Sequence, residues 1–296
     1  EICACLVGSE MCIRDRDWVD EILRAAIVQS YNLSFTKADK KSNQLFSLGY
    51  YDQQGLVKLS DFKRVSGRFN SEYKLFDDHL RIGENISLSH SWGTSVSNNA
   101  ALGGTLYEAY KFQSITPVKN LEDEYAGNVF SDIPNPMGKL HRNKDNKDKK
   151  SRLVGNLYAE LHLFDGFMFK TSFGADYNNL YRRSFSPKYD EINASEKLSG
   201  LSNRNAWNFN WVFTNTLNYT KTFGDHTINA LLGLESLRNR YEYFTASRDG
   251  FPSDDPNFHF LDAGDVGTQK NSGSATEYSM VSYFGKIDYN YHDRYL

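Results

Sequence analysis

The sequence predicts an all-β chain that forms part of a transmembrane antiparallel β-barrel with meander topology and long extracellular loops. Three observations predict it. First, the chain is hydrophilic, with a mean hydropathy of −0.60, yet it carries 19 Tyr, 20 Phe and 4 Trp among 296 residues. Second, apolar and polar residues alternate along many segments, as they do on strands with one lipid-facing side. Third, the connections between these segments alternate between short and long, as in outer-membrane barrels.

Bulk properties exclude two other classes of protein. No run of 18 or more apolar residues occurs in the sequence, which excludes a helical membrane protein. The net charge is −3 and the pI is near 6.2, so the chain lacks the global basic field that is typical of nucleic-acid binding. We therefore expect no nucleic-acid partner.

The alternation is clearest over 207–223. Rings and aliphatic side chains occupy the odd positions there: Trp207, Phe209, Trp211, Phe213, Leu217, Tyr219 and Phe223. Asn and Thr occupy nearly all of the even positions. In an extended strand these two sets point to opposite faces. One face is therefore lipid-like, and the other is small and hydrated.

Eight other segments repeat this pattern, which brings the expected number of strands to nine. In order, we expect strands over 27–36, 43–52, 62–75, 79–92, 152–163, 167–177, 207–223, 227–238 and 278–291. Many exceed the roughly five or six residues of soluble strands and match the ~9–11 needed to cross a bilayer. Residues 294–296 resemble the start of a tenth strand. Since a single-chain bacterial barrel normally has an even number of strands, we expect about nine strands of a larger barrel.

The connections separate this fold from a soluble β-sandwich, which has no reason to alternate its loop lengths. Short connections are expected at 37–42, 76–78, 164–166, 223–226 and 292–293, and longer ones at 53–61, 93–151, 178–206 and 239–277. The short set should face the periplasm and the long set the outside. A short helix is expected at 100–111 within the longest loop. The nine strands alone should form a curved open sheet with two unpaired edges.

The first sixteen residues differ from the rest. They hold all three cysteines, at positions 3, 5 and 12, and no second Cys/His pair completes a zinc site. Residues 6–15 resemble the translation of a transposon-type sequencing adapter. We therefore interpret 1–16 as an assembly artefact and leave it out of fold reasoning.

Several long, ordered motifs carry a family resemblance. They are DWVDEI at 17–22, QSYNLS at 29–34, SLGYYDQQG at 47–55, SDFKRVSGR at 60–68, NNAALGG at 98–104, the stretch from 135 to 156, SYFGKIDY at 282–289 and DRYL at 293–296. In these motifs the sequence after residue 16 resembles SusC/RagA-type TonB-dependent receptors.

The resemblance implies an outer-membrane receptor whose barrel has 22 strands and is closed by an N-terminal plug domain. It implies active uptake of an oligosaccharide or peptide, a SusD-like surface lipoprotein as a partner, and energy supplied by the TonB complex through the plug. Residues 17–296 contain no plug or C-terminal strands, so we expect an incomplete, non-autonomous part of the barrel. The alternatives are a passive porin, a structural or adhesive barrel and, with less support, a membrane-embedded hydrolase.

No catalytic, cofactor-binding or metal-binding residue is expected, because the seven histidines are scattered singly. Loop aromatics could stack on sugar rings or pack against each other or the lipoprotein: Tyr107, Tyr110, Phe112, Phe258 and Phe260. The basic run 139–152 could attract anionic sugars or lipopolysaccharide phosphates, although a solvated loop is favoured. The acidic loop 249–265 could bind Ca²⁺, although simple hydration is favoured there too. Rings near strand ends should form the interfacial girdle: Tyr31, Trp92, Trp207, Tyr219, Tyr289 and Tyr291.

Overall fold

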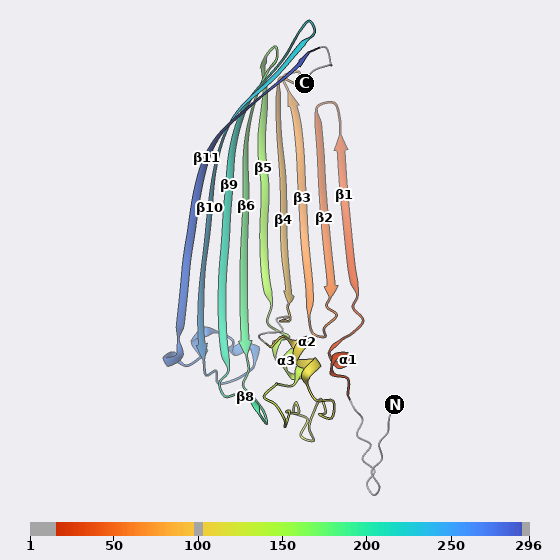
Figure 1. Ribbon diagram of the computed structural model, residues 1–296, viewed down its shortest axis with the longest axis vertical. Coiled ribbons are helices and arrows are strands. Elements are labelled where there is room, and N and C mark those ends of the chain that lie inside the picture. The colour runs from red at the N-terminus through yellow and green to blue at the C-terminus, as the bar shows by residue number, and fades with distance from the viewer. Residues whose placement is uncertain (1–15, 98–102, 292–296) are drawn as a thin grey trace.

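The structure, a computed structural model, describes residues 16–97 and 103–291. Nine long strands form one antiparallel sheet in which neighbours in the sheet are also successive long strands of the chain, in the order β1-β2-β3-β4-β5-β6-β9-β10-β11 (Figure 1). The expected meander is therefore confirmed. The proposed adapter segment 6–15 and the proposed tenth strand at 294–296 lie outside the described residues.

All nine predicted strands are confirmed. Their bounds are β1 Val28–Ala38, β2 Ser42–Gln54, β3 Asp61–Leu75, β4 Leu80–Thr94, β5 Asp148–Phe164, β6 Phe167–Ser186, β9 Gly200–Phe223, β10 His226–Asp249 and β11 Lys270–Tyr291. The prediction underestimated the last four at their loop ends: β6 has 20 residues, β9 and β10 have 24 each, and β11 has 22. Outside the bilayer both faces meet water, so the alternation of apolar residues stops while main-chain pairing continues.

The connections fall at two ends of the sheet. Tight turns at 39–41, 76–79, 165–166 and 224–225 lie at one end, and the loops 55–60, 95–147, 187–199 and 250–269 lie at the other (Figure 1). The predicted alternation is thus confirmed. The last two loops are shorter than expected, because β6, β9, β10 and β11 extend into the ranges assigned to them.

The loop end carries short elements. They are the helices α1 Trp18–Ile22, α2 Thr105–Lys111 and α3 Pro136–Asn143, the hairpin of β7 Tyr189–Glu191 and β8 Ala194–Glu196, and the 3-10 turns η2 Pro256–Phe258, η3 Leu261–Ala263 and η4 Val266–Thr268. The helix expected at 100–111 is confirmed over 105–111, whereas α1, α3 and the β7–β8 hairpin were not predicted. Among the described residues, no helix is long and apolar enough to span a membrane.

Cross-strand pairing gives the wall one apolar and one polar face. Phe46 lies opposite Phe35 and Phe69, and Phe69 lies opposite Ile86, so these side chains share one face. This face is open, as the 51% exposure of Leu88 shows. The clusters of buried apolar side chains in the described part of the chain lie at the loop end instead. An exposed apolar face this large needs hydrocarbon rather than water around it.

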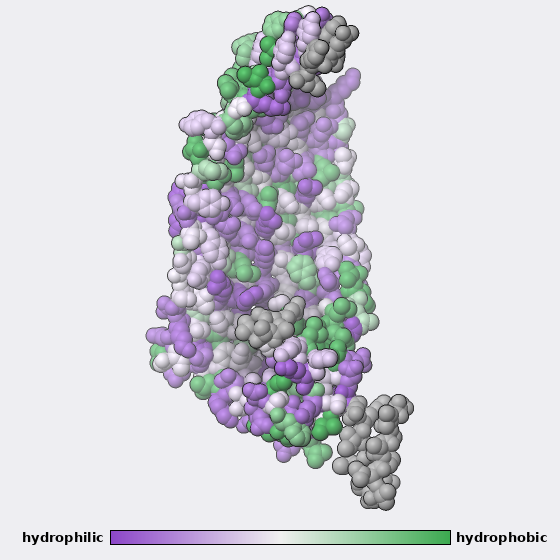
Figure 2. Space-filling view, in the orientation of Figure 1, coloured by the Kyte–Doolittle hydropathy of each residue, from purple (hydrophilic) through white to green (hydrophobic). Residues whose placement is uncertain are grey.

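The opposite face is polar. Asn70, Asn85 and Asn156 form one row across β3, β4 and β5, and the Arg152 and Asp176 side chains form an ion pair of 2.7 Å across β5 and β6. Figure 2 views the hollowed side of the sheet, whose middle is largely hydrophilic. We identify this polar face with the barrel lumen, and the apolar face with the outward, lipid-facing surface.

One polar cluster interrupts the outward face. Glu84 lies between Ile82 and Ile86 on that face, and the Ser71 hydroxyl on β3 donates a hydrogen bond to its carboxylate. Beside them, the Gln44 amide donates to the Tyr73 hydroxyl at 2.8 Å. The four groups form two hydrogen-bonded pairs, which lowers the cost of placing them against lipid.

Replacing Leu88 by Arg tests the assignment of faces. Because Leu88 faces outward, we expect Leu88→Arg to lower the free energy of unfolding of the membrane-inserted, full-length protein by about 2–4 kcal/mol near the bilayer midplane. Ser87→Arg changes the adjacent residue on the polar face and should have a much smaller effect. Urea unfolding in lipid vesicles measures both; equal destabilisation would contradict the assignment.

Candidate binding site at the loop end of the wall

Three loop helices pack into one buried cluster, here called the loop core, which consists of Trp18, Ile22, Ala109, Phe112 and Leu140. The Trp18 indole N–H donates to the Gln113 carbonyl at 2.9 Å, and its ring meets the Phe112 ring edge-on with centroids 4.6 Å apart. Segments that lie far apart in the sequence are thereby fixed to one another. The long loop is therefore a folded body rather than a loose connection.

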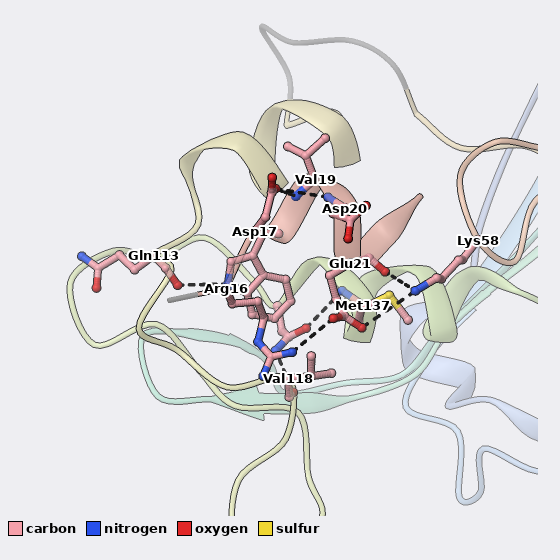
Figure 3. A network of polar contacts seen from close by, with 11 residues as sticks. Arg16, Asp17, Val19, Asp20, Glu21, Lys58, Gln113, Val118 and Met137 are labelled. Carbon is pink, nitrogen blue, oxygen red and sulfur yellow. Dashed lines mark hydrogen bonds and ion pairs between the residues drawn. The ribbon is translucent and has the colours of Figure 1, made fainter. Parts of the chain in front are cut away.

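Polar contacts attach α1 to this body (Figure 3). The Asp17 carboxylate accepts from the main-chain N–H groups of Val19 and Asp20, which caps the helix. Glu21 pairs with the Arg16 guanidinium at 3.1 Å. The Lys58 ammonium donates to the Glu21 carbonyl at 2.5 Å. The segment before β1 and the loop 55–60 are thus held together.

Asn135 and Glu191 join α3 to the β7–β8 hairpin. The Asn135 side-chain oxygen accepts from Met137 and Gly138 N–H, and Pro136 occupies the first helical turn. The main-chain N–H of Asn135 donates to one Glu191 oxygen at 2.6 Å, and the Arg142 guanidinium donates to the other at 2.6 Å. Glu191 is only 3% exposed, so this carboxylate is a buried link.

A cavity of about 560 Å³ lies between α3, the start of β5 and the end of β6. Its volume falls in the range of small-molecule sites, roughly 300–1,000 Å³. Hydroxyl groups line it from several segments: Ser95, Ser97, Thr105, Ser184 and Ser186. The cavity can therefore offer many hydrogen bonds to a polar ligand.

The cations of the cavity wall are already neutralised. Lys139 pairs with Glu108 at 2.7 Å, Arg142 with Glu191 at 2.6 Å, and Arg182 with Asp148 at 2.5 Å. The Arg142 guanidinium also lies 3.8 Å from the centre of the Tyr189 ring. Burial raises the pKa of the Tyr189 hydroxyl. The site thus suits uncharged hydrogen-bonding groups better than an isolated ion.

None of the five loop aromatics proposed to stack on sugar rings lines this cavity. Tyr107 and Tyr110 lie on α2, and Tyr110 is 83% exposed. Phe258 and Phe260 are exposed on the loop 250–269, on either side of His259, whose ring stacks on Phe185. Their role in binding stays a prediction. Phe112 instead belongs to the loop core. This agrees with the alternative that the loop aromatics pack within the protein rather than on a sugar.

Sequence reasoning missed the cavity because it missed α3, which supplies Lys139 and Arg142. The pair Asn135-Pro136 was a usable signal, since Asn is a favoured N-cap and Pro is favoured at the first helical position. For metals, no group of three His, Cys, Asp or Glu side chains in the described residues is placed to hold an ion.

Comparison with known proteins extends this picture. No family model matches the sequence. The chain is 28% identical over 287 residues to TonB-dependent receptor P3 of Formosa agariphila. That match covers 95% of this chain and 28% of that protein. It is 25% identical over 301 residues to TonB-dependent receptor SusC of Bacteroides thetaiotaomicron. This second match covers 95% of this chain and 29% of that protein.

Solved structures share the fold. The RagAB peptide transporter superposes with a TM-score of 0.82 at 21% identity, over 94% of this chain and 32% of that chain. The ferric citrate transporter FecA in its unliganded form matches with a TM-score of 0.50 at 13% identity, over 89% of this chain and 33% of that chain. The present chain therefore spans about a third or less of the length of these relatives.

The two-sided wall and these matches define an outer-membrane β-barrel protein. Within that class, the chain resembles SusC/RagA-type TonB-dependent receptors, to which it is similar along 95% of its length. The relatives are receptors and transporters rather than enzymes, in agreement with the prediction from the sequence.

Removing the buried Glu191 carboxylate should loosen the loop body. Glu191→Ala leaves the Arg142 charge and the Asn135 N–H without their partner, and loss of a buried ion-pair partner costs about 3–5 kcal/mol. Hydrogen exchange of α3 in the full-length protein should speed up accordingly. Asp190→Ala breaks the neighbouring exposed pair with Lys197 and should change nothing measurable; similar exchange in both variants would contradict the proposed link.

Acid should loosen the same helix through His141. Burial, followed by the nearby Lys144 charge, lowers the pKa of the His141 imidazole below its ordinary value of 6.5. The unfolded loop then binds the proton more tightly than the folded loop does, so stability is lost as the pH falls from 6.5 through the folded pKa. Amide exchange of α3, corrected for intrinsic rates, should rise between pH 7.5 and about pH 5.5, and His141→Gln should reduce that dependence.

Proposed function

We propose that this chain forms part of the wall of a receptor that imports a nutrient across the outer membrane with energy from the TonB complex. The observation that carries the proposal is a continuous nine-stranded wall, apolar outside and polar inside, with a lined cavity at its loop end. A polar inner face lowers the cost of moving a hydrated solute past it. The similarity to TonB-dependent receptors over 95% of the chain supports active rather than passive passage.

The cavity suggests an oligosaccharide or a short peptide as the nutrient. Both present hydroxyl or amide groups, which match the serine hydroxyls and the neutralised ion pairs of the wall. One of the similar solved structures, RagAB, is a peptide transporter. The loop body would then hold the ligand at the outer end before it enters the lumen.

The remaining parts of the machine are also proposals. We infer that residues 17–296 belong to a larger barrel, of 22 strands by analogy with plugged transporters, and that residues 1–16 are an assembly artefact. A plug domain elsewhere in the full-length protein would receive the pull of TonB. A SusD-like surface lipoprotein would cover the loop end and the exposed rings of α2.

Uptake in cells tests the proposal. Cells that express the full-length receptor should take up labelled oligosaccharides or peptides, and deletion of tonB should abolish uptake. Uptake that persists without TonB would support a passive porin instead.

Filling the cavity tests the site. Ser184→Trp places a ring in the cavity and should lower uptake at least about tenfold, which corresponds to about 1.4 kcal/mol of lost binding. Ser247 lies on the same cross-strand row and face, through Ser202, but does not line the cavity. Ser247→Trp should therefore transport normally; equal effects of both variants would argue against this cavity.

A further inference from the structure

The basic run 139–152 does not form one solvated loop. Its last part is the start of β5, where Lys149 and Lys150 point to opposite faces of the wall. Lys150 lies opposite Ser91 and Leu180 on the polar face. Lys149 lies opposite Trp92 on β4 and Tyr181 on β6, on the outward face.

The surroundings of Lys149 mark the outer limit of the lipid-facing band. Outward side chains of neighbouring strands form rows across the wall. The second such row from Lys149 toward the tight turns carries Leu88, Leu153 and Tyr177. At the level of Lys149 it carries Trp92 and Tyr181, rings of the kind that occupy the headgroup region of a membrane. Lys149 is therefore a cation at headgroup depth.

A second cation stands beside it. Arg183 follows Tyr181 by two residues on the same face of β6, and such diagonal neighbours on adjacent strands lie about 7–8 Å apart. With the residues that the structure describes, neither Lys149 nor Arg183 forms an ion pair. A doubly charged anion between these two cations could contact both of them. The rings of Trp92 and Tyr181 lie on the same face.

Other outward cations near this level are already paired. Lys63 lies 3.0 Å from Asp52. Farther along the wall, Arg240 approaches the Trp207 ring at 5.6 Å, but it also pairs with Glu242 at 2.8 Å. Arg238 pairs with Glu277 at 2.5 Å. The unpaired positive charge on the outward face near this level thus lies on β5 and β6.

We propose that Lys149 and Arg183, framed by Trp92 and Tyr181, bind the phosphate of an anionic glycolipid in the outer leaflet. An ammonium and a guanidinium group both donate strong charge-assisted hydrogen bonds to phosphate oxygens. The next outward row is polar and carries His90, Ser151 and Asn179. Beyond it, the acyl chains of such a lipid meet Leu153 and Tyr177. The site faces away from the lumen, so it is independent of nutrient uptake.

Lipid retention by the full-length receptor tests the proposal. The purified protein is reconstituted in phosphatidylcholine vesicles with and without lipid A, and bound lipid A is quantified by mass spectrometry. The double variant Lys149→Gln/Arg183→Gln should bind lipid A about ten- to thirtyfold more weakly, as expected for the loss of two basic contacts. Lys150→Gln removes the same charge one residue away on the opposite face and should bind like the wild type.

Three results would overturn the proposal: unchanged lipid A binding in the double variant, an equal loss in Lys150→Gln, or thermal stabilisation by inorganic phosphate as large as that by lipid A. The last would indicate a free-anion site. Heat-modifiable migration on gels verifies that every variant is folded. Nutrient uptake by the double variant should stay normal, so a failure of this proposal is distinct from a failure of the uptake proposal.

Discussion

Main-chain hydrogen bonding in hydrocarbon is the constraint on which the rest of this structure depends. No water is available there to satisfy N–H and C=O groups, so each strand within the wall must pair on both sides. An unbroken antiparallel ladder meets this demand, and it forces successive side chains to opposite faces. The two-sidedness of the wall follows directly: Phe46 and Phe69 meet lipid because Leu45 and Asn70 meet the lumen.

The same constraint explains how much could be predicted from the sequence. Within the bilayer, alternation such as that of Phe209, Phe213 and Leu217 reports strand, face and register together, so all nine strands could be located. Beyond it both faces are wet, and the pattern vanishes although pairing continues to Asp249 on β10. The ends of the long strands could not be read for that reason.

The loop end follows different rules, and little of it could be predicted. Its core depends on Trp18, Phe112 and Leu140, which meet only through tertiary contacts between distant segments. One carboxylate, Glu191, joins a hairpin to α3 across 56 residues of sequence. Single-sequence patterns carry no trace of such pairings, so the cavity beside α3 emerged only from the structure. The candidate rings Tyr107 and Tyr110 were placed correctly in the loop but not in the cavity.

The length of the last strands determines how far the loop end of the wall stands above the bilayer. The row that carries Trp92, Lys149 and Tyr181 reaches β10 at Phe244, yet that strand runs on to Asp249. At about 3.3 Å per residue, this stretch adds roughly 15 Å of paired sheet along the strand direction. The sheet thus rises above the lipid as a stiff collar, and the loops 187–199 and 250–269 are carried on its rim. In the proposed uptake, a solute is therefore first captured on this side at a height above the bilayer rather than at the membrane plane.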